Sequence, residues 1–150
     1  MALEIRTLSP EWEYSLAKFF SCLQDSADQY FHPHPLTDEY AHRLARYSGA
    51  DSYYLVVHNG AILAYGMLRG WDEGYEVPSL GIVVHPDHRG NKLGELLMLF
   101  LHAVARHRGA KAVRLKVYRE NTAARDFYLR LGYAFDAENF GEQMIGILTL

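Results

Sequence analysis

The chain has 150 residues, of which 49% are hydrophobic and 22% are charged, and its formal net charge at neutral pH is −3. This length and composition predict one globular domain over residues 1–150 with a sizeable hydrophobic core. The slightly acidic balance argues against a general nucleic-acid binder and against a binder of anionic membranes. We therefore expect no nucleic-acid partner and no membrane partner, although a local basic site remains compatible with the composition.

The chain start and the cysteine content bear on cellular location. Residues 1–6 do not resemble a signal peptide, and the longest apolar run, 96–101, is far too short to span a bilayer. Cys22 is the only cysteine, so an intrachain disulfide is impossible. These features predict a cytoplasmic protein, with Cys22 packed on an amphipathic helix rather than acting as a catalytic thiol.

The N-terminal third predicts a strand followed by two helices. Residues 2–8 alternate between apolar and polar side chains as a strand does. Residues 9–11, Ser-Pro-Glu, are typical of a helix start, and a capping box at 37–40 opens a second helix that ends near Tyr47. One face of the first helix is apolar, with Leu16, Phe19, Phe20 and Leu23.

A β-hairpin and a short central strand follow. The segments 53–58 and 61–68 flank Asn59-Gly60, which is a strong two-residue hairpin signal. After a polar, aromatic loop over 69–78, the apolar residues 80–84 predict another strand.

The second half alternates helices with strands. Apolar side chains from 93 to 104 recur at helical spacing and predict a long helix packed on a sheet. Residues 113–117 alternate as a strand, and 121–131 predict a further helix. The last segments, 133–140 and 143–150, predict a hairpin. This element order predicts an α/β domain whose mixed sheet is covered by helices on both faces.

The turn between the strand at 80–84 and the helix that begins at Leu93 predicts an anion site. A turn that exposes successive backbone N–H groups at a helix N-terminus favours a bound phosphate. Arg89 adds a full positive charge, while Gly90 and Gly94 let a ligand and the packed strand approach closely.

With these residues the sequence resembles the GNAT superfamily of N-acetyltransferases, which transfer acetyl groups from acetyl-CoA to amines. The family pattern is a strand ending Val-x-Pro, then Arg/Gln-x-x-Gly-x-Gly/Ala at a helix start, and residues 84–86 and 89–94 match it. One departure is Lys92, which stands where the family usually has its first glycine and which offers its backbone N–H if its backbone is helical. The downstream family pattern, Asn-x-x-Ala, then Tyr, then Gly-Phe/Tyr, matches Asn121, Ala124, Tyr128, Gly132 and Tyr133.

The resemblance implies a fold and a co-substrate. We expect an α/β (α+β) fold with a mixed, mostly antiparallel sheet of about seven strands flanked by four helices. Acetyl-CoA would lie in the cleft between two splayed central strands, and no metal is implied. A backbone N–H near Val83 or Val84 would polarise the thioester carbonyl. The residues that the resemblance assigns to acetyl-CoA are Ile82, Val83, Val84, Arg89, Gly90, Asn91, Lys92, Leu93, Gly94, Asn121 and Tyr128.

Catalysis would centre on Tyr128, which by resemblance is the general acid that protonates the departing coenzyme A thiolate. Asn121 lies seven residues earlier on the same helical face and either binds the pantetheine arm or caps the helix. The general base is open among six residues, and Glu76 is favoured because it precedes the central strand closely enough to reach an incoming amine, directly or through water. The candidates are His32, His34, Asp72, Glu73, Glu76 and His85.

Two aromatic, polar loops, 29–36 and 69–78, predict the acceptor site. Their aromatic and acidic side chains suit a cationic or hydroxyl-rich amine, and amino sugars are slightly favoured over other small molecules. A peptide or protein α-amine is the alternative. The His-x-His pair at 32–34 is not expected to bind metal, because no further Cys or His lies nearby at ligand spacing. The residues predicted to contact the acceptor are Phe31, His32, His34, Trp71, Glu73 and Tyr75.

The expected function is N-acetylation of a small primary amine by direct attack in a ternary complex. An acyl-CoA-binding sensor without catalysis is a different class, and Tyr128 argues against it because a pure binder needs no proton donor. A Rossmann-type nucleotide binder would carry the glycine turn after its first strand, whereas here the turn follows the fourth. By resemblance, a homodimer could form through the last strand, using Ile145, Ile147 and Leu148.

Overall fold

The structure is a computed structural model that describes residues 2–25, 31, 33–136 and 141–150. Within these residues, one seven-stranded sheet has the strand order β1-β2-β3-β4-β5-β7-β6. Its neighbouring strands pair antiparallel except for β4 and β5, which run parallel. The strands are β1 Glu4–Thr7, β2 Ser52–His58, β3 Ala61–Arg69, β4 Ser79–Val84, β5 Ala112–Tyr118, β6 Ala134–Phe135 and β7 Gln143–Thr149.

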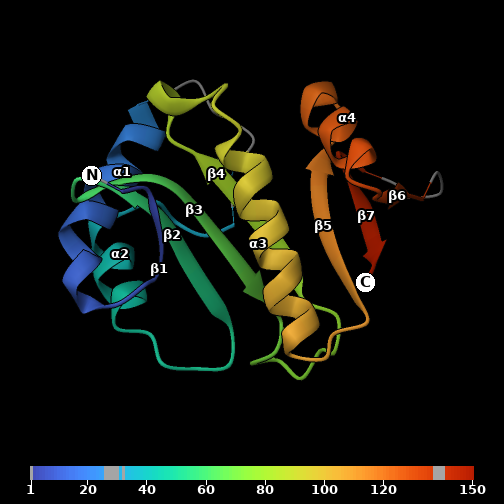
Figure 1. Ribbon diagram of the computed structural model, residues 1–150, viewed down its shortest axis with the longest axis horizontal. Helices are drawn as coiled ribbons and strands as arrows, with labels where there is room; N and C mark the ends of the chain where they lie inside the picture. The colour runs from blue at the N-terminus through green and yellow to red at the C-terminus, as the bar shows by residue number, and fades with distance from the viewer. Residues whose placement is uncertain (1, 26–30, 32, 137–140) are drawn as a thin grey trace.

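Helices cover both faces of the sheet (Figure 1). On one face, α1 (Glu13–Asp25) and α2 (Asp38–Ala45) enclose a core cluster that includes Phe20, Tyr65 and Val83. On the other, α3 (Leu93–His107) encloses a second cluster, against which residues of α4 (Thr122–Arg130) pack. The two faces are called the α1/α2 face and the α3 face below.

The expected architecture is confirmed, and the differences lie at element ends. The first helix begins with a 3₁₀ turn, Pro10–Trp12, before α1 starts at Glu13. The hydroxyl of Thr37 accepts a hydrogen bond from the Tyr40 N–H at 3.1 Å, so the predicted N-cap of α2 is confirmed. Of the predicted strand 133–140, only Ala134–Phe135 forms a described strand, β6, and 137–140 lie outside the described residues.

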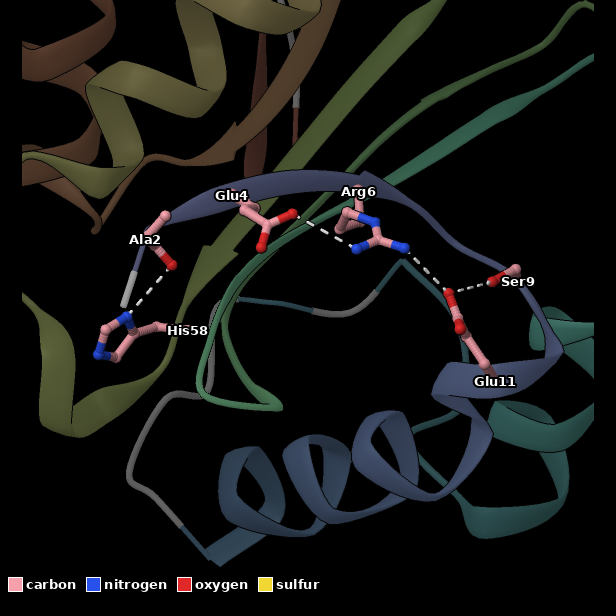
Figure 2. Close-up of polar contacts among 6 residues, drawn as sticks. All are labelled: Ala2, Glu4, Arg6, Ser9, Glu11 and His58. Carbon is pink, nitrogen blue, oxygen red and sulfur yellow. Dashed lines mark hydrogen bonds and ion pairs between the residues drawn. The ribbon is translucent and has the colours of Figure 1, made fainter.

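The edge strand β1 is flanked by charged side chains. The Arg6 guanidinium donates to the carboxylates of Glu4 at 3.4 Å and Glu11 at 3.2 Å, and the Ser9 hydroxyl donates to Glu11 (Figure 2). Exposed pairs of this kind stabilise a fold by only about 0–1 kcal/mol. The ladder to β2 therefore holds β1, and the charges mainly protect the edge from pairing with other chains.

Only at their N-terminal ends do the parallel strands β4 and β5 pair, where Ser79 lies opposite Arg114. The two strands then separate toward their C-terminal ends, and this separation opens the sheet (Figure 1). Side chains of β4 alternate between the two faces: Val83 belongs to the α1/α2 cluster, whereas Ile82 and Val84 pack against the cluster beneath α3.

A buried polar pair joins α3 to the segment after α4. The Nε2 atom of His102 lies 2.7 Å from the Tyr133 hydroxyl, and the two residues are 3% and 2% exposed. A neutral imidazole can accept this hydroxyl proton, and burial lowers the pKa of His102 to about 4. The imidazole is therefore neutral in the folded protein at neutral pH.

This pair predicts a loss of stability in mild acid. The unfolded chain binds a proton at His102 near pH 6.5, whereas the folded chain binds it near pH 4. The neutral His102 therefore contributes fully to the free energy of unfolding above about pH 6.5. As the pH falls from there to about 4, this free energy decreases by about 3 kcal/mol. Urea unfolding of wild type and His102→Gln across this range measures it, and the variant should show a shallower pH dependence. Equal slopes would contradict the assignment to His102.

Candidate active site

A cleft of about 1090 Å³ lies where β4 and β5 separate, and its walls come from both faces of the sheet. The turn after β4 and the start of α3 form one wall, and α4 forms another. Phe31 and Pro33, from the segment between α1 and α2, line it as well. Ten of the eleven residues predicted to contact acetyl-CoA line this cleft, and the exception is Asn91.

The turn at the start of α3 gathers positive charge. A 3₁₀ turn, Pro86–His88, redirects the chain after β4, and Gly90 follows with a φ of +85°. The N-terminus of α3 has no side-chain cap, so its first N–H groups are available to a ligand. Arg89 and Lys92 line the cleft beside it. A bound phosphate would meet backbone donors, the helix dipole and two cationic residues here.

The backbone of Lys92 is left-handed, with a φ of 62° and a ψ of 20°. The helical backbone on which its role as an N–H donor was conditional is therefore not found. A side chain in this region is strained and glycine is not, which explains why the family pattern has glycine here.

Two substitutions at Lys92 separate its backbone from its charge. Lys92→Gly should raise the free energy of unfolding by about 1 kcal/mol relative to Lys92→Ala, because only glycine relieves the left-handed strain. Both variants lose the same ammonium group and should bind coenzyme A equally weakly compared with wild type. Thermal unfolding and calorimetric titration with coenzyme A measure the two effects. Equal stabilities of the two variants would contradict the strain.

The backbone of β4 presents alternate N–H groups to the cleft. The His85 N–H donates to the Leu63 carbonyl of β3 at 2.7 Å, and the Pro78 carbonyl accepts from the Arg114 N–H of β5 at 3.0 Å. Because backbone groups alternate in direction along a strand, odd-numbered residues here point to β3 and even-numbered ones to β5. Val83 therefore directs its N–H at β3, and the donors that face the cleft are those of Ile82 and Val84.

Tyr128 of α4 lines the cleft with a protonated phenol. Burial raises the pKa of Tyr128 to about 12. Its hydroxyl makes no hydrogen bond to another residue of the described chain, and its ring lies 5.8 Å from that of Tyr133. Asn121 also lines the cleft, and its side-chain oxygen accepts from the Ala124 N–H at 3.3 Å. The capping role of Asn121 is therefore confirmed.

Of the residues predicted in the segment 29–36, Phe31 lines the cleft but His34 does not. The His34 ring stacks on Tyr40 at 4.5 Å, its Nε2 lies 2.9 Å from the Tyr65 hydroxyl, and burial lowers its pKa. His34 thus supports the cleft wall from behind. His32 lies outside the described residues.

Residues of the loop between β3 and β4 lie away from the cleft. This loop precedes β4, whereas the phosphate turn follows the other end of this six-residue strand, about 20 Å away. The Trp71 ring packs on the Arg108 guanidinium at 3.5 Å, near the C-terminus of α3, and Asp51 accepts hydrogen bonds from three backbone N–H groups of the loop. None of the predicted residues of this loop lines the cleft, namely Trp71, Asp72, Glu73, Tyr75 and Glu76.

The cleft also contains residues that sequence reasoning missed. The most informative are Lys116 and Tyr118 of β5 and Gln143 of β7, which lie in neighbouring strands. Their signal in the sequence is the alternation of polar with apolar residues over 112–118, which showed that β5 has a polar face but not that this face reaches a cleft. No group of three or more metal-ligating side chains occurs within the described residues.

Comparison with known proteins identifies the family. The sequence matches the profile of the Acetyltransferase (GNAT) family over residues 17–133. The chain belongs to the GNAT acetyltransferase family. A search of curated proteins found no significant match. No helix within the described ranges is long and apolar enough to cross a bilayer.

Solved GNAT structures share the fold over the whole chain. The GNAT domain of S. lividans PAT superposes with a TM-score of 0.84 at 16% identity, covering 99% of this chain and 90% of that one. The paia N-acetyltransferase from Thermoplasma acidophilum, in complex with coenzyme A, has a TM-score of 0.79 at 18% identity, with full coverage of both chains. The structure of yncA from Salmonella typhimurium with acetyl-CoA has a TM-score of 0.74 at 20% identity, and the match covers 100% of this chain and 95% of that one.

Proposed function

We propose that this GNAT protein transfers an acetyl group from acetyl-CoA to a primary amine by direct attack in a ternary complex. The observation that carries the proposal is that one cleft is lined by the cationic turn at Arg89, the free edge of β4 and the phenol of Tyr128. A phosphate site, an oxyanion donor and a proton donor are what acyl transfer from a coenzyme A thioester requires. Bound acetyl-CoA would supply the activated acetyl group.

Each residue has a separate task in this mechanism. Arg89 and the N–H groups of the α3 N-terminus hold the pyrophosphate. The N–H of Ile82 or Val84 donates to the carbonyl oxygen as it gains negative charge, which contributes about 3 kcal/mol to lowering the barrier. The amine nitrogen forms its bond to the carbonyl carbon, the carbon–sulfur bond breaks, and Tyr128 gives its proton to the sulfur.

The proton that the amine loses goes to water in this proposal. The described lining of the cleft includes one imidazole, His88 of the turn after β4, and one carboxylate, Glu95 at the start of α3, and both belong to the predicted phosphate turn rather than to the β4 segment that holds the N–H donors. The predicted base, Glu76, lies in the exposed loop before β4. Solvent that reaches the amine from the open side can accept its proton.

Release of coenzyme A thiol from acetyl-CoA, with amines offered in turn, tests this function. The panel spans amino acids, amino acid amides, amino sugars, polyamines and short peptides, and mass spectrometry identifies the acetylated product. Turnover that requires an amine and yields its N-acetyl derivative supports the proposal, and preference for peptides would assign a peptide α-amine acceptor. Tight binding of acetyl-CoA without turnover on any amine would instead favour a sensor of acyl-CoA.

A further inference from the structure

Basic side chains of β5 project from the α1/α2 face of the sheet. Val113 and Leu115 are buried in the cluster beneath α3, so the alternate residues Arg114 and Lys116 point to the opposite face. The core cluster beneath α1 and α2 contains residues of β2, β3 and β4 but none of β5 among the described residues. This part of the sheet therefore leaves its basic side chains open to a ligand.

The two cations differ in their environment. Lys116 is exposed and lines the cleft. Arg114 is half-buried, and its Nε is a buried donor with no hydrogen-bond partner in the described chain. A buried donor that lacks a partner is costly and uncommon. The buried Nε–H of Arg114 is therefore typical of a donor that forms its hydrogen bond with a bound ligand.

A row of residues across three strands ties Arg114 to the cleft wall. Arg114 lies opposite Ser79 of β4, and Ser79 lies opposite Arg69 of β3. All three point to the α1/α2 face, because Arg69 and Ser79 alternate in step with Met67 and Val83 of that cluster. The Arg69 guanidinium donates to the Pro33 carbonyl at 2.8 Å, and Pro33 lines the cleft.

Neither Arg114 nor Lys116 has an ion-pair partner among the described residues. Asp51, at the Arg69 end of the row, accepts from three backbone N–H groups through one carboxylate oxygen. Asp136 follows β6, which β7 separates from β5.

We infer that the acceptor is a small amine that also carries an anionic group, a carboxylate or a phosphate, which Arg114 and Lys116 bind. The inference rests on the proposed function, because it names the acceptor of that reaction. Ser79 of β4 lies opposite Arg114 of β5, so two residues further along each strand Lys116 is level with Gly81. Gly81 directly precedes Ile82, whose N–H faces the cleft. One small molecule can therefore reach the cations with its anion and the thioester with its amine. Polycationic amines, aminoglycosides included, are repelled.

Pairs of amines that differ only in charge test the inference. Amino acids are compared with their amides, and phosphoethanolamine with ethanolamine, which also distinguishes a carboxylate site from a phosphate site. Wild type should have a KM about 10- to 100-fold lower for the anionic member, since a charge-assisted contact contributes that much. Lys116→Gln and Arg114→Gln should each raise that KM about 10-fold and leave the KM for the neutral member and for acetyl-CoA unchanged.

Two further variants make the result specific. Lys111→Gln removes one positive charge from an exposed residue just before β5 that does not line the cleft, and it should change neither KM. Lys116→Glu, at an exposed position that tolerates polar side chains, should reverse the preference toward cationic amines. Equal KM values for anionic and neutral amines in wild type would overturn the inference, as would an anionic preference that survives both Gln variants.

A binding measurement separates this inference from the proposed function. Calorimetric titration of the coenzyme A complex with N-acetylglycine and with N-acetylglycinamide needs no turnover, and only the first should bind measurably in wild type and weaken in Lys116→Gln. Equal binding of the two would overturn the anion site alone. Failure of the proposed function would instead appear as no amine-dependent release of coenzyme A thiol in the acetyl-CoA assay, whichever of the two products binds.

Discussion

Tyr128→Phe should lower kcat by about 100- to 10,000-fold, the usual range for loss of a positioned proton donor. The thiolate of coenzyme A would then leave without a proton from the protein. Because burial raises the pKa of Tyr128 to about 12, the phenol stays protonated over the whole assay range. Wild-type kcat should therefore show no loss from titration of this group below about pH 10. Steady-state kinetics with saturating acetyl-CoA measure both effects.

A neighbouring tyrosine supplies the control for this prediction. Tyr133 is buried, its ring lies 5.8 Å from that of Tyr128, and its hydroxyl is bonded to His102 rather than directed at a ligand. Tyr133→Phe should lower the free energy of unfolding by about 1–3 kcal/mol, because the imidazole loses its partner, and should change kcat little. If both variants lose kcat equally, Tyr128 acts through packing and the acid role is refuted.

Local signals in the sequence were sufficient to predict the turn and the helix start that line one wall of the cleft. A proline, two glycines and an arginine at fixed spacing predict the turn at 84–94, and an apolar stripe predicts the helix that follows it. Each of these features acts within a few residues, so sequence alone predicts the element and its place. The Asn121 cap on α4 was predictable for the same reason.

The acceptor half depends on pairing between distant strands, and here several of the predicted residues do not line the cleft. The loop at 69–78 is aromatic and acidic, but β4 runs away from it toward the phosphate turn, so its side chains miss the cleft. The direction in which β4 and β5 separate decides which end of β4 meets a ligand, and no local pattern encodes it. The same pairing directs the N–H of Ile82, rather than that of Val83, into the cleft.

The positive charge of Arg114 and Lys116 near the acceptor site was not predictable from the sequence, for a related reason. Arg114 and Lys116 are an ordinary polar face of a strand when the sequence is taken alone. Only the register through Ser79 places Arg114 beside β4, and only the fold places Lys116 in the cleft that Pro33 also lines. The preference for amino sugars rested on the aromatic and polar residues of both predicted acceptor loops, of which Phe31 lines the cleft, whereas the cations that line or flank the cleft favour an anionic amine.

Arg89→Gln and Gly90→Ala should each weaken acetyl-CoA binding by about 10- to 100-fold. Arginine binds phosphate through two parallel hydrogen bonds that glutamine cannot reproduce. Gly90 lines the cleft, and an added Cβ there would meet no heavy atom within 4 Å apart from those of its chain neighbours, so we expect it to occupy space that a bound phosphate would use. The KM for acetyl-CoA should rise while kcat at saturation stays near the wild-type value. Kinetics at varied acetyl-CoA, with calorimetric titration of coenzyme A, measure the change.

A matched glycine separates the lost affinity from backbone strain. Gly109 has the same φ of +85° as Gly90 and equally open surroundings, but it lies beyond the opposite end of α3. Alanine at either position should cost about 1–2 kcal/mol of stability, since each imposes a side chain on a left-handed backbone. Only Gly90→Ala should lose affinity for coenzyme A. If Gly109→Ala lost it as well, the effect would come from strain transmitted along α3, and the turn would not be the phosphate site.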